Sequence, residues 1–289
     1  MNQARTGGGA PLSASRPGRA NRGSVGAAID AAAAEGRAAL IAYLPVGFPD
    51  VAESIGAVKA LIDAGADIVE LGLPYSDPVM DGPVIEGAVT AALAGGVRVA
   101  DTMRAVEALA PTGVPLLVMS YYAPILATGV ERFAADLASA GGAGLITPDL
   151  IPDEAGAWLA ASETHGLDRV FLVAPSSSDS RLRLVAEACR GFVYVASTMG
   201  ITGERTTLSA AAKDLTVRTR AAGASRACVG VGVSTPAHAA EVAQYADGVI
   251  VGSAFVRLLR DAETPAAARA ALSDLAGRLR QSAVRGAGR

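Results

Sequence analysis

The chain has 289 residues, of which 51% are apolar and only 4% aromatic, and its formal net charge is −3. No cluster of lysine and arginine interrupts the part of the sequence that reads as globular, so nucleic acid is not an expected partner. No uninterrupted apolar run approaches the roughly 18 residues of a membrane-spanning helix, so no membrane span is expected.

The two ends of the chain differ in composition from the middle. Residues 1–24 are rich in glycine, alanine, serine and arginine and contain neither an acidic residue nor the apolar core of a signal peptide. We therefore predict a disordered N-terminal tail over 1–24, one domain over 25–284 and a frayed C-terminus over 285–289. Cys189 and Cys228 lack paired-ligand spacing, which favours reduced thiols in a cytoplasmic protein.

From residue 25 onward one pattern repeats: an amphipathic helix, a short turn and an apolar run rich in β-formers. The pattern predicts eight strands, over 38–46, 68–73, 115–120, 144–148, 169–174, 192–197, 227–233 and 248–252. It predicts helices over 25–35, 51–64, 84–94, 102–109, 130–140, 154–165, 180–190, 208–222, 236–245, 254–259 and 265–284.

Strict alternation of strands and helices requires parallel pairing with right-handed crossovers. The strands are continuously apolar, so both faces of the sheet are buried. Eight such units in about 250 residues favour a closed (β/α)8 barrel, the TIM barrel, with the helix over 25–35 as an extra N-terminal helix that caps the barrel floor. The alternative is an open doubly wound sheet, but its dinucleotide fingerprint is incomplete at Gly230-Val231-Gly232 and falls late in the chain.

Carboxylates are the candidates for acid–base chemistry, because the chain has only two histidines. Glu70 lies within the second predicted strand, where alternation points every second side chain into the barrel. A carboxylate there loses solvent, its pKa rises, and it can exchange protons near neutral pH. The alternative role for Glu70 is a structural one, capping backbone amides.

Two further carboxylates, Asp77 and Asp81, lie on the loop after that strand, which three prolines stiffen. Either could instead cap a helix or shape a turn, which is the usual role of aspartate in such loops. Their spacing alone does not show which of the two contacts a ligand.

Glycine-bearing turns follow the last three strands. They are Gly200-Ile201-Thr202-Gly203, Gly230-Val231-Gly232, and Gly252-Ser253, which opens a short helix. Backbone amides that converge at these strand ends, with a helix N-terminus behind them, form the phosphate site of many barrels. The alternative is that the glycines only permit tight turns. No histidine, cysteine and aspartate grouping has metal-ligand spacing, so no metal site is predicted.

The motif around Glu70 resembles the signature of a known family. The motif Glu70-Leu71-Gly72-x-Pro74-Tyr75-Ser76-Asp77-Pro78-x-x-Asp81-Gly82-Pro83 is similar to that of the tryptophan synthase alpha subunit, where phenylalanine usually precedes the serine. The resemblance continues in order through Met119-Ser120-Tyr121-Tyr122, Pro148-Asp149-Leu150, Leu172-Val173-Ala174-Pro175, Gly191-Phe192-Val193-Tyr194, Gly200-Ile201-Thr202-Gly203, Gly230-Val231-Gly232-Val233-Ser234 and Gly248-Val249-Ile250-Val251-Gly252-Ser253.

This resemblance implies a lyase of L-tryptophan biosynthesis that cleaves indole-3-glycerol phosphate to indole and D-glyceraldehyde 3-phosphate by a retro-aldol reaction. It implies no cofactor, since pyridoxal phosphate belongs to the beta subunit. By motif position Glu70 is the acid–base catalyst and Asp81 accepts the indole N–H. The remaining substrate-binding positions implied are Tyr43 and Tyr194 as pocket walls, Thr202 in a closing loop, and Gly203, Gly232, Gly252 and Ser253 at the phosphate.

The resemblance also implies an alpha-beta-beta-alpha heterotetramer, in which indole passes to the beta subunit. The interface positions implied are Asp77, Pro78, Met80 and Ala123. Many members have aspartate where this chain has Phe48, alanine at Met80 and asparagine at Ala123, and two of these differences fall in the interface loops. The alternatives are therefore a stand-alone lyase that releases free indole, a weakly active alpha-like activator of a beta subunit and, more distantly, another phosphate-binding barrel enzyme.

Overall fold

The computed structural model describes residues 24–196, 205–230 and 232–286. The strands are β1 (Ala39–Pro45), β2 (Ile68–Gly72), β3 (Leu116–Met119), β4 (Gly144–Thr147), β5 (Asp168–Val173), β6 (Val193–Ala196), β7 (Ala227–Gly230) and β8 (Gly248–Val251). The helices are α1 (Val25–Ala34), α2 (Val51–Asp63), α3 (Pro83–Ala94), α4 (Val99–Leu109), α5 (Tyr122–Thr128), α6 (Val130–Ser139), α7 (Gly156–His165), α8 (Asp179–Ala188), α9 (Arg205–Ala221), α10 (Pro236–Ala243), α11 (Ser253–Asp261) and α12 (Pro265–Ser282), with short 3-10 helices η1 (Ala110–Thr112) and η2 (Pro152–Glu154).

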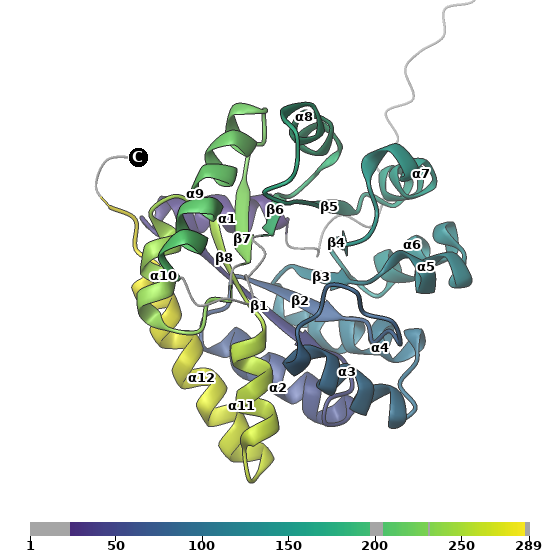
Figure 1. Ribbon diagram of the computed structural model, residues 1–289. Helices are drawn as coiled ribbons and strands as arrows, with labels where there is room; N and C mark the ends of the chain where they lie inside the picture. Colours follow the sequence, from purple (N-terminus) through teal and green to yellow (C-terminus); the bar gives the residue numbers. More distant parts are fainter. Residues whose placement is uncertain (1–23, 197–204, 231, 287–289) are drawn as a thin grey trace, which may run out of the picture.

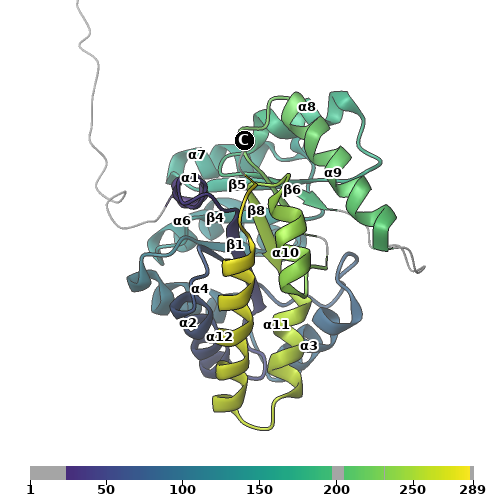
Figure 2. The ribbon, with the colours of Figure 1, turned by 90° about the vertical axis from the view of Figure 1, so that its left-hand side faces the viewer.

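The strands form a closed barrel in sequence order, and every neighbouring pair is parallel (Figure 1). β1 closes the ring against β8, with Ala39 opposite Gly248 in register. Helices surround the barrel, and α12 runs beside α10 and α11 on its outside (Figure 2). The predicted (β/α)8 barrel and all eight predicted strands are therefore confirmed.

α1 caps the floor of the barrel, as predicted. Ser24 begins this helix by accepting the N–H of Ala27. Val25, Ile29 and Ala32 on its inner face are at most 1% exposed. They form one apolar cluster with inward side chains of the strands, namely Ala39, Ile41, Ile68, Leu117, Ile146, Val170, Cys228 and Ile250. The lower barrel is thus a packed core rather than a channel.

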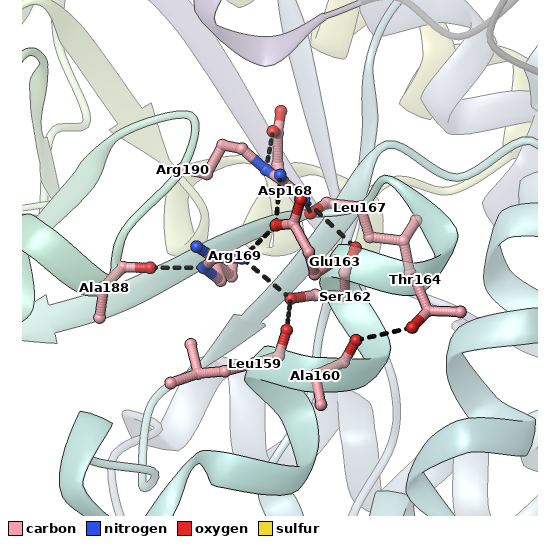
Figure 3. Close-up of polar contacts among 10 residues, drawn as sticks. All are labelled: Leu159, Ala160, Ser162, Glu163, Thr164, Leu167, Asp168, Arg169, Ala188 and Arg190. Atoms are coloured by element: carbon pink, nitrogen blue, oxygen red, sulfur yellow. Dashed lines mark hydrogen bonds and ion pairs between the residues drawn. The ribbon is translucent and has the colours of Figure 1, made fainter. Parts of the chain in front are cut away.

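Partly buried aspartates form hydrogen bonds and ion pairs at the starts of strands on this side of the barrel. Asp67, directly before β2, accepts the Leu40 N–H at 2.7 Å and pairs with the Arg37 guanidinium at 2.6 Å. Asp168, the first residue of β5, lies 3.5 Å from Arg190, and Glu163 bridges Arg190 and Arg169 (Figure 3). The side chains of Asp67 and Asp168 are only 14% and 17% exposed, so their ion pairs compensate charges that burial would otherwise leave unpaired.

A third aspartate, Asp247, ties down the C-terminal end of the described chain. Its carboxylate accepts the Ala227 N–H at 2.9 Å and pairs with Arg285 at 3.0 Å. The Arg285 N–H in turn donates to the Gly36 carbonyl at 2.8 Å. Arg285 and Gly286, which we expected to fray, are therefore held against the barrel. Residues 287–289, and residues 1–23 of the tail predicted over 1–24, lie outside the described residues.

One helix was not predicted. In α5, the N–H of Tyr122 donates to the Asp149 carboxylate at 2.9 and 3.1 Å. This cap comes from the loop after the next strand rather than from the preceding residues, so local sequence patterns do not reveal it. The helix ends at Gly129, which has a φ of 90° that glycine tolerates.

The remaining predicted features concern cysteines and membrane spans. Both cysteines are free thiols, and burial raises the pKa of the Cys189 thiol to about 12. Among the described residues no single helix is long and apolar enough to cross a membrane. Two helical stretches, Pro83–Ala94 and Val99–Thr112, meet that criterion only together, and a bend of 105° separates them.

Candidate active site

Glu70 lies in the middle of β2 and is fully buried. Its Cα is in register with Tyr43 on β1 and Leu117 on β3. Neither carboxylate oxygen has a hydrogen-bond partner in the described part of the chain. Burial raises the pKa of Glu70 to about 8. The alternative of a carboxylate that caps backbone amides therefore fails, and Glu70 is an acid that holds its proton at neutral pH.

Two tyrosines share the environment of Glu70. Tyr43 on β1 is 6% exposed, and Tyr194 on β6 is half-buried. Burial raises the pKa of each phenol well above its ordinary value, and the charges of Glu70 and Asp81 raise both further. The two carboxylates thus act on the same pair of phenols, so the structure brings these four predicted site residues together.

Two strand glycines make room for these tyrosines, and sequence reasoning missed this role. A Cβ on Gly72 would lie 2.4 Å from the Tyr43 hydroxyl oxygen, and one on Gly230 would lie 2.4 Å from that of Tyr194. Strand alternation places Gly72 on the same inward face as Glu70, which is the signal that could have found it.

We expect Gly72→Ala to lower the free energy of unfolding by roughly 1–3 kcal/mol, because the added methyl displaces the buried Tyr43 ring. Equilibrium unfolding in urea measures it. Gly87→Ala is the matched control: it lies on the exposed face of α3 with nothing within 4 Å of the added carbon, and should be neutral or stabilising. Equal stability of Gly72→Ala and the unsubstituted chain would contradict this packing argument.

Asp81 lies on the loop between β2 and α3 and is half-buried. Burial, and then the charge of Glu86, raise the pKa of Asp81 to about 6. Asp77, by contrast, is exposed and accepts a hydrogen bond from the Ser76 hydroxyl at 2.5 Å. The structure therefore separates the two aspartates that spacing did not, and only Asp81 has the desolvation of a functional carboxylate.

The predicted phosphate residues fall at the ends of β7 and β8, which pair with each other. Gly232 has a φ of 57°, and Gly252 precedes Ser253, the first residue of α11, whose N-terminus has no side-chain cap. Uncapped N–H groups at a helix start attract anions. Thr202 and Gly203 lie outside the described residues.

The predicted interface residues lie on the outside of the same barrel end. Asp77 and Ala123 are exposed and Pro78 is half-buried. Met80 is 51% exposed, and its neighbour Val79 is 80% exposed. Two further apolar side chains, Leu126 in α5 and Ile151 in the loop after β4, are 58% and 42% exposed. Exposed apolar side chains in the segments that follow neighbouring strands are typical of a protein-binding surface.

The described residues contain no group of three or more histidine, cysteine, aspartate or glutamate side chains that could hold a metal ion. The structure is a closed parallel barrel with a buried carboxyl group of raised pKa on one strand and a second carboxyl group on the loop that follows that strand. This arrangement is typical of barrel enzymes that use acid–base chemistry.

Comparisons with known proteins identify the family. The family model of the tryptophan synthase alpha chain matches residues 29–284. The tryptophan synthase alpha chain of Acidothermus cellulolyticus is 54% identical over 265 residues, covering 91% of this chain and 99% of the relative. That of Salinispora arenicola is 57% identical over 257 residues, covering 88% and 96%. A solved structure of Mycobacterium tuberculosis tryptophan synthase matches with a TM-score of 0.84 at 54% identity, covering 92% of this chain and 100% of the other. The chain belongs to the tryptophan synthase alpha chain family.

Proposed function

We propose that the chain is a lyase that cleaves indole-3-glycerol phosphate to indole and D-glyceraldehyde 3-phosphate. The observation that carries this proposal is the carboxyl group of Glu70, which is fully buried, has no hydrogen-bond partner among the described residues and has a pKa that burial raises to about 8. A group that is protonated in the free enzyme and has a pKa near neutral pH can donate a proton and accept one again within a single turnover.

Glu70 alone can carry out both proton transfers of the reaction. Its carboxylic acid protonates the indole ring carbon that bears the glycerol chain, which converts the ring to an indolenine with positive charge on nitrogen. The resulting carboxylate then takes the proton of the adjacent chain hydroxyl. As that hydroxyl becomes the aldehyde, the carbon–carbon bond breaks, its electron pair returns to the ring, and Glu70 is again protonated.

Asp81 supplies the second charge. As a carboxylate it accepts the indole N–H and stabilises the positive charge that develops there. Its pKa of about 6 leaves it ionised at neutral pH, whereas Glu70 remains protonated. Two carboxyl groups whose environments separate their pKa values in this way can act as acid and anion in one site.

The other site residues hold the substrate. Tyr43 and Tyr194 line the pocket beside the reacting ring. The backbone amides of Gly203, Gly232, Gly252 and Ser253 bind the phosphate, with the N-terminus of α11 as the source of positive potential, and Thr202 belongs to the loop that closes the site. An anchored phosphate fixes the reacting carbon against Glu70, which lowers the entropic part of the barrier.

The partner we propose is a tryptophan synthase beta subunit, which carries the pyridoxal phosphate, in an alpha-beta-beta-alpha heterotetramer. The exposed apolar side chains of Val79, Met80, Leu126 and Ile151, together with Asp77, Pro78 and Ala123, form the surface that it would cover. The loop that bears Asp77, Val79 and Met80 also carries Asp81, so a docked partner would contact the loop on which the proposed catalytic carboxylate lies.

The test is indole release from indole-3-glycerol phosphate, by the purified chain alone and then with a beta subunit of a close relative. We expect slow release by the chain alone and strong acceleration, with co-elution, when the beta subunit is added. High unaided turnover without co-elution would instead indicate the stand-alone lyase, and acceleration of the beta subunit without turnover would indicate the alpha-like activator. No indole under any condition would refute the lyase.

A further inference from the structure

In the described part of the chain, one side chain makes the hydrogen bond and the ring contact that attach the loop carrying Asp81 to the rest of the barrel. Among these residues, the hydrogen bonds and ring contacts that join residues 74–81 to another segment are made by Tyr121. Its hydroxyl oxygen accepts the Met80 N–H at 2.9 Å. Its ring lies 5.3 Å from that of Tyr75, centroid to centroid. Because Val79 and Met80 are 80% and 51% exposed, apolar burial of these two side chains contributes little to holding the loop.

Tyr121 is itself fixed on both sides. The carbonyl of Tyr121 accepts the hydroxyl of Ser120 at 2.7 Å, and the Ser120 N–H donates to the Ile146 carbonyl of β4 at 3.0 Å. On the other side, the N–H of Tyr122, the first residue of α5, donates to the Asp149 carboxylate. The backbone of Tyr121 is thus held in place between β3 and α5, and its side chain contacts the neighbouring loop through the ring and the hydroxyl.

We propose that Tyr121 is a positioning residue for the lyase reaction: by accepting the Met80 N–H, its hydroxyl holds Asp81 in the half-buried position from which it meets the indole nitrogen. This inference rests on the proposed function only for its effect on turnover. The attachment of the loop is a property of the free chain. Tyr121 itself transfers no proton in the reaction.

The pKa of Asp81 depends on how deeply the loop buries its carboxyl group. Burial is the main cause of its raised pKa, and the charge of Glu86 on α3 is the second. The remaining titratable groups that interact with it are the phenols of Tyr43, Tyr121 and Tyr194, which are neutral at the pH of the reaction. A loop released from Tyr121 exposes Asp81 to water, so the pKa of Asp81 falls toward its ordinary value.

The experiment compares Tyr121→Phe with Tyr75→Phe in the full chain. Each variant removes one hydroxyl from the same aromatic pair, but only the Tyr121 hydroxyl makes a hydrogen bond among the described residues. We expect amide hydrogen exchange in the peptide spanning residues 76–83 to accelerate roughly threefold to tenfold in Tyr121→Phe, as the loss of one hydrogen bond predicts, and to stay unchanged in Tyr75→Phe.

The second readout is indole release as a function of pH. We expect kcat to fall roughly threefold to tenfold in Tyr121→Phe, and the acidic limb of kcat/KM to move to lower pH, with neither change in Tyr75→Phe. In an Asp81→Asn background, Tyr121→Phe should cause no further loss, because it acts through Asp81.

Three results would overturn the proposal: unchanged exchange in Tyr121→Phe, equal losses in both phenylalanine variants, or additive losses in the double variant. The exchange readout does not depend on turnover. Faster exchange in a chain that never releases indole would therefore leave the attachment of the loop standing and remove the lyase assignment instead.

Discussion

Glu70→Gln is expected to reduce indole release at least ~10²-fold, since the reaction loses the group that both donates and accepts the proton. The amide has nearly the same shape as the carboxylic acid that Glu70 presents at neutral pH, so the fully buried site stays filled and the barrel stays folded. Steady-state release of indole measures the loss, and circular dichroism checks the fold.

The matched control for this variant is Glu107→Gln, which makes the same change at an exposed position on α4. It should leave the rate unchanged. Near-normal turnover in Glu70→Gln would remove Glu70 from the mechanism, and an equal loss in both variants would point to a general effect of replacing glutamate by glutamine rather than to the site.

The same substitution is expected to change the dependence of stability on pH. The pKa of Glu70 is about 8 in the folded chain, against 4.5 for an ordinary glutamate, so the folded state binds the proton more tightly than the unfolded state does. The contribution of Glu70 to the free energy of unfolding therefore falls as pH rises from about 4.5 to about 8, by up to about 5 kcal/mol. Above pH 8 this contribution no longer changes, because the group is ionised in both states.

Because other groups also titrate in this range, the measurement is the difference between the unsubstituted chain and Glu70→Gln. Unfolding in urea at pH 5, 6.5 and 8 should show the variant gaining in relative stability as pH rises. The uncharged amide escapes the cost of ionising a buried carboxyl, and any cost of burying the amide is the same at each pH. Two curves that run parallel across this range would contradict the raised pKa.

Together these two expected results describe a residue that is retained for chemistry at the expense of stability. Glu70 is buried among apolar strands and has no hydrogen-bond partner in the part of the chain that the structure describes, a position that a stable fold would fill with an apolar side chain. A raised pKa of this kind arises because the surroundings disfavour the charged form, so activity and instability have one physical origin.

The barrel was predictable because its determinants are local. Each strand is a continuous apolar run and each helix carries its own periodic face, so the ends of the predicted elements lie within about three residues of those observed. The placement of Glu70 follows from its position in such a strand, and alternation alone directs it inward.

The contacts that escaped prediction all join residues distant in sequence. α5 begins because Asp149, 27 residues after Tyr122, caps it. Arg285 is ordered because Asp247, 38 residues earlier, binds its guanidinium. The role of Tyr121 depends on a hydrogen bond that crosses 41 residues. No periodicity or motif encodes such partners, because only the closed barrel brings them together.

The floor of the barrel has a practical consequence for attaching the protein to a surface. α1 begins at Ser24 beneath the strands, and Arg285 is held at Gly36 on that same side. Asp81 and the loops proposed to meet substrate and partner lie at the opposite, carboxyl end of the strands, and Glu70 lies within β2 between the two ends. A label or immobilisation tether joined directly at Ser24 or at Gly286 therefore leaves the mouth of the barrel facing the solution, accessible to substrate and to a docking protein alike.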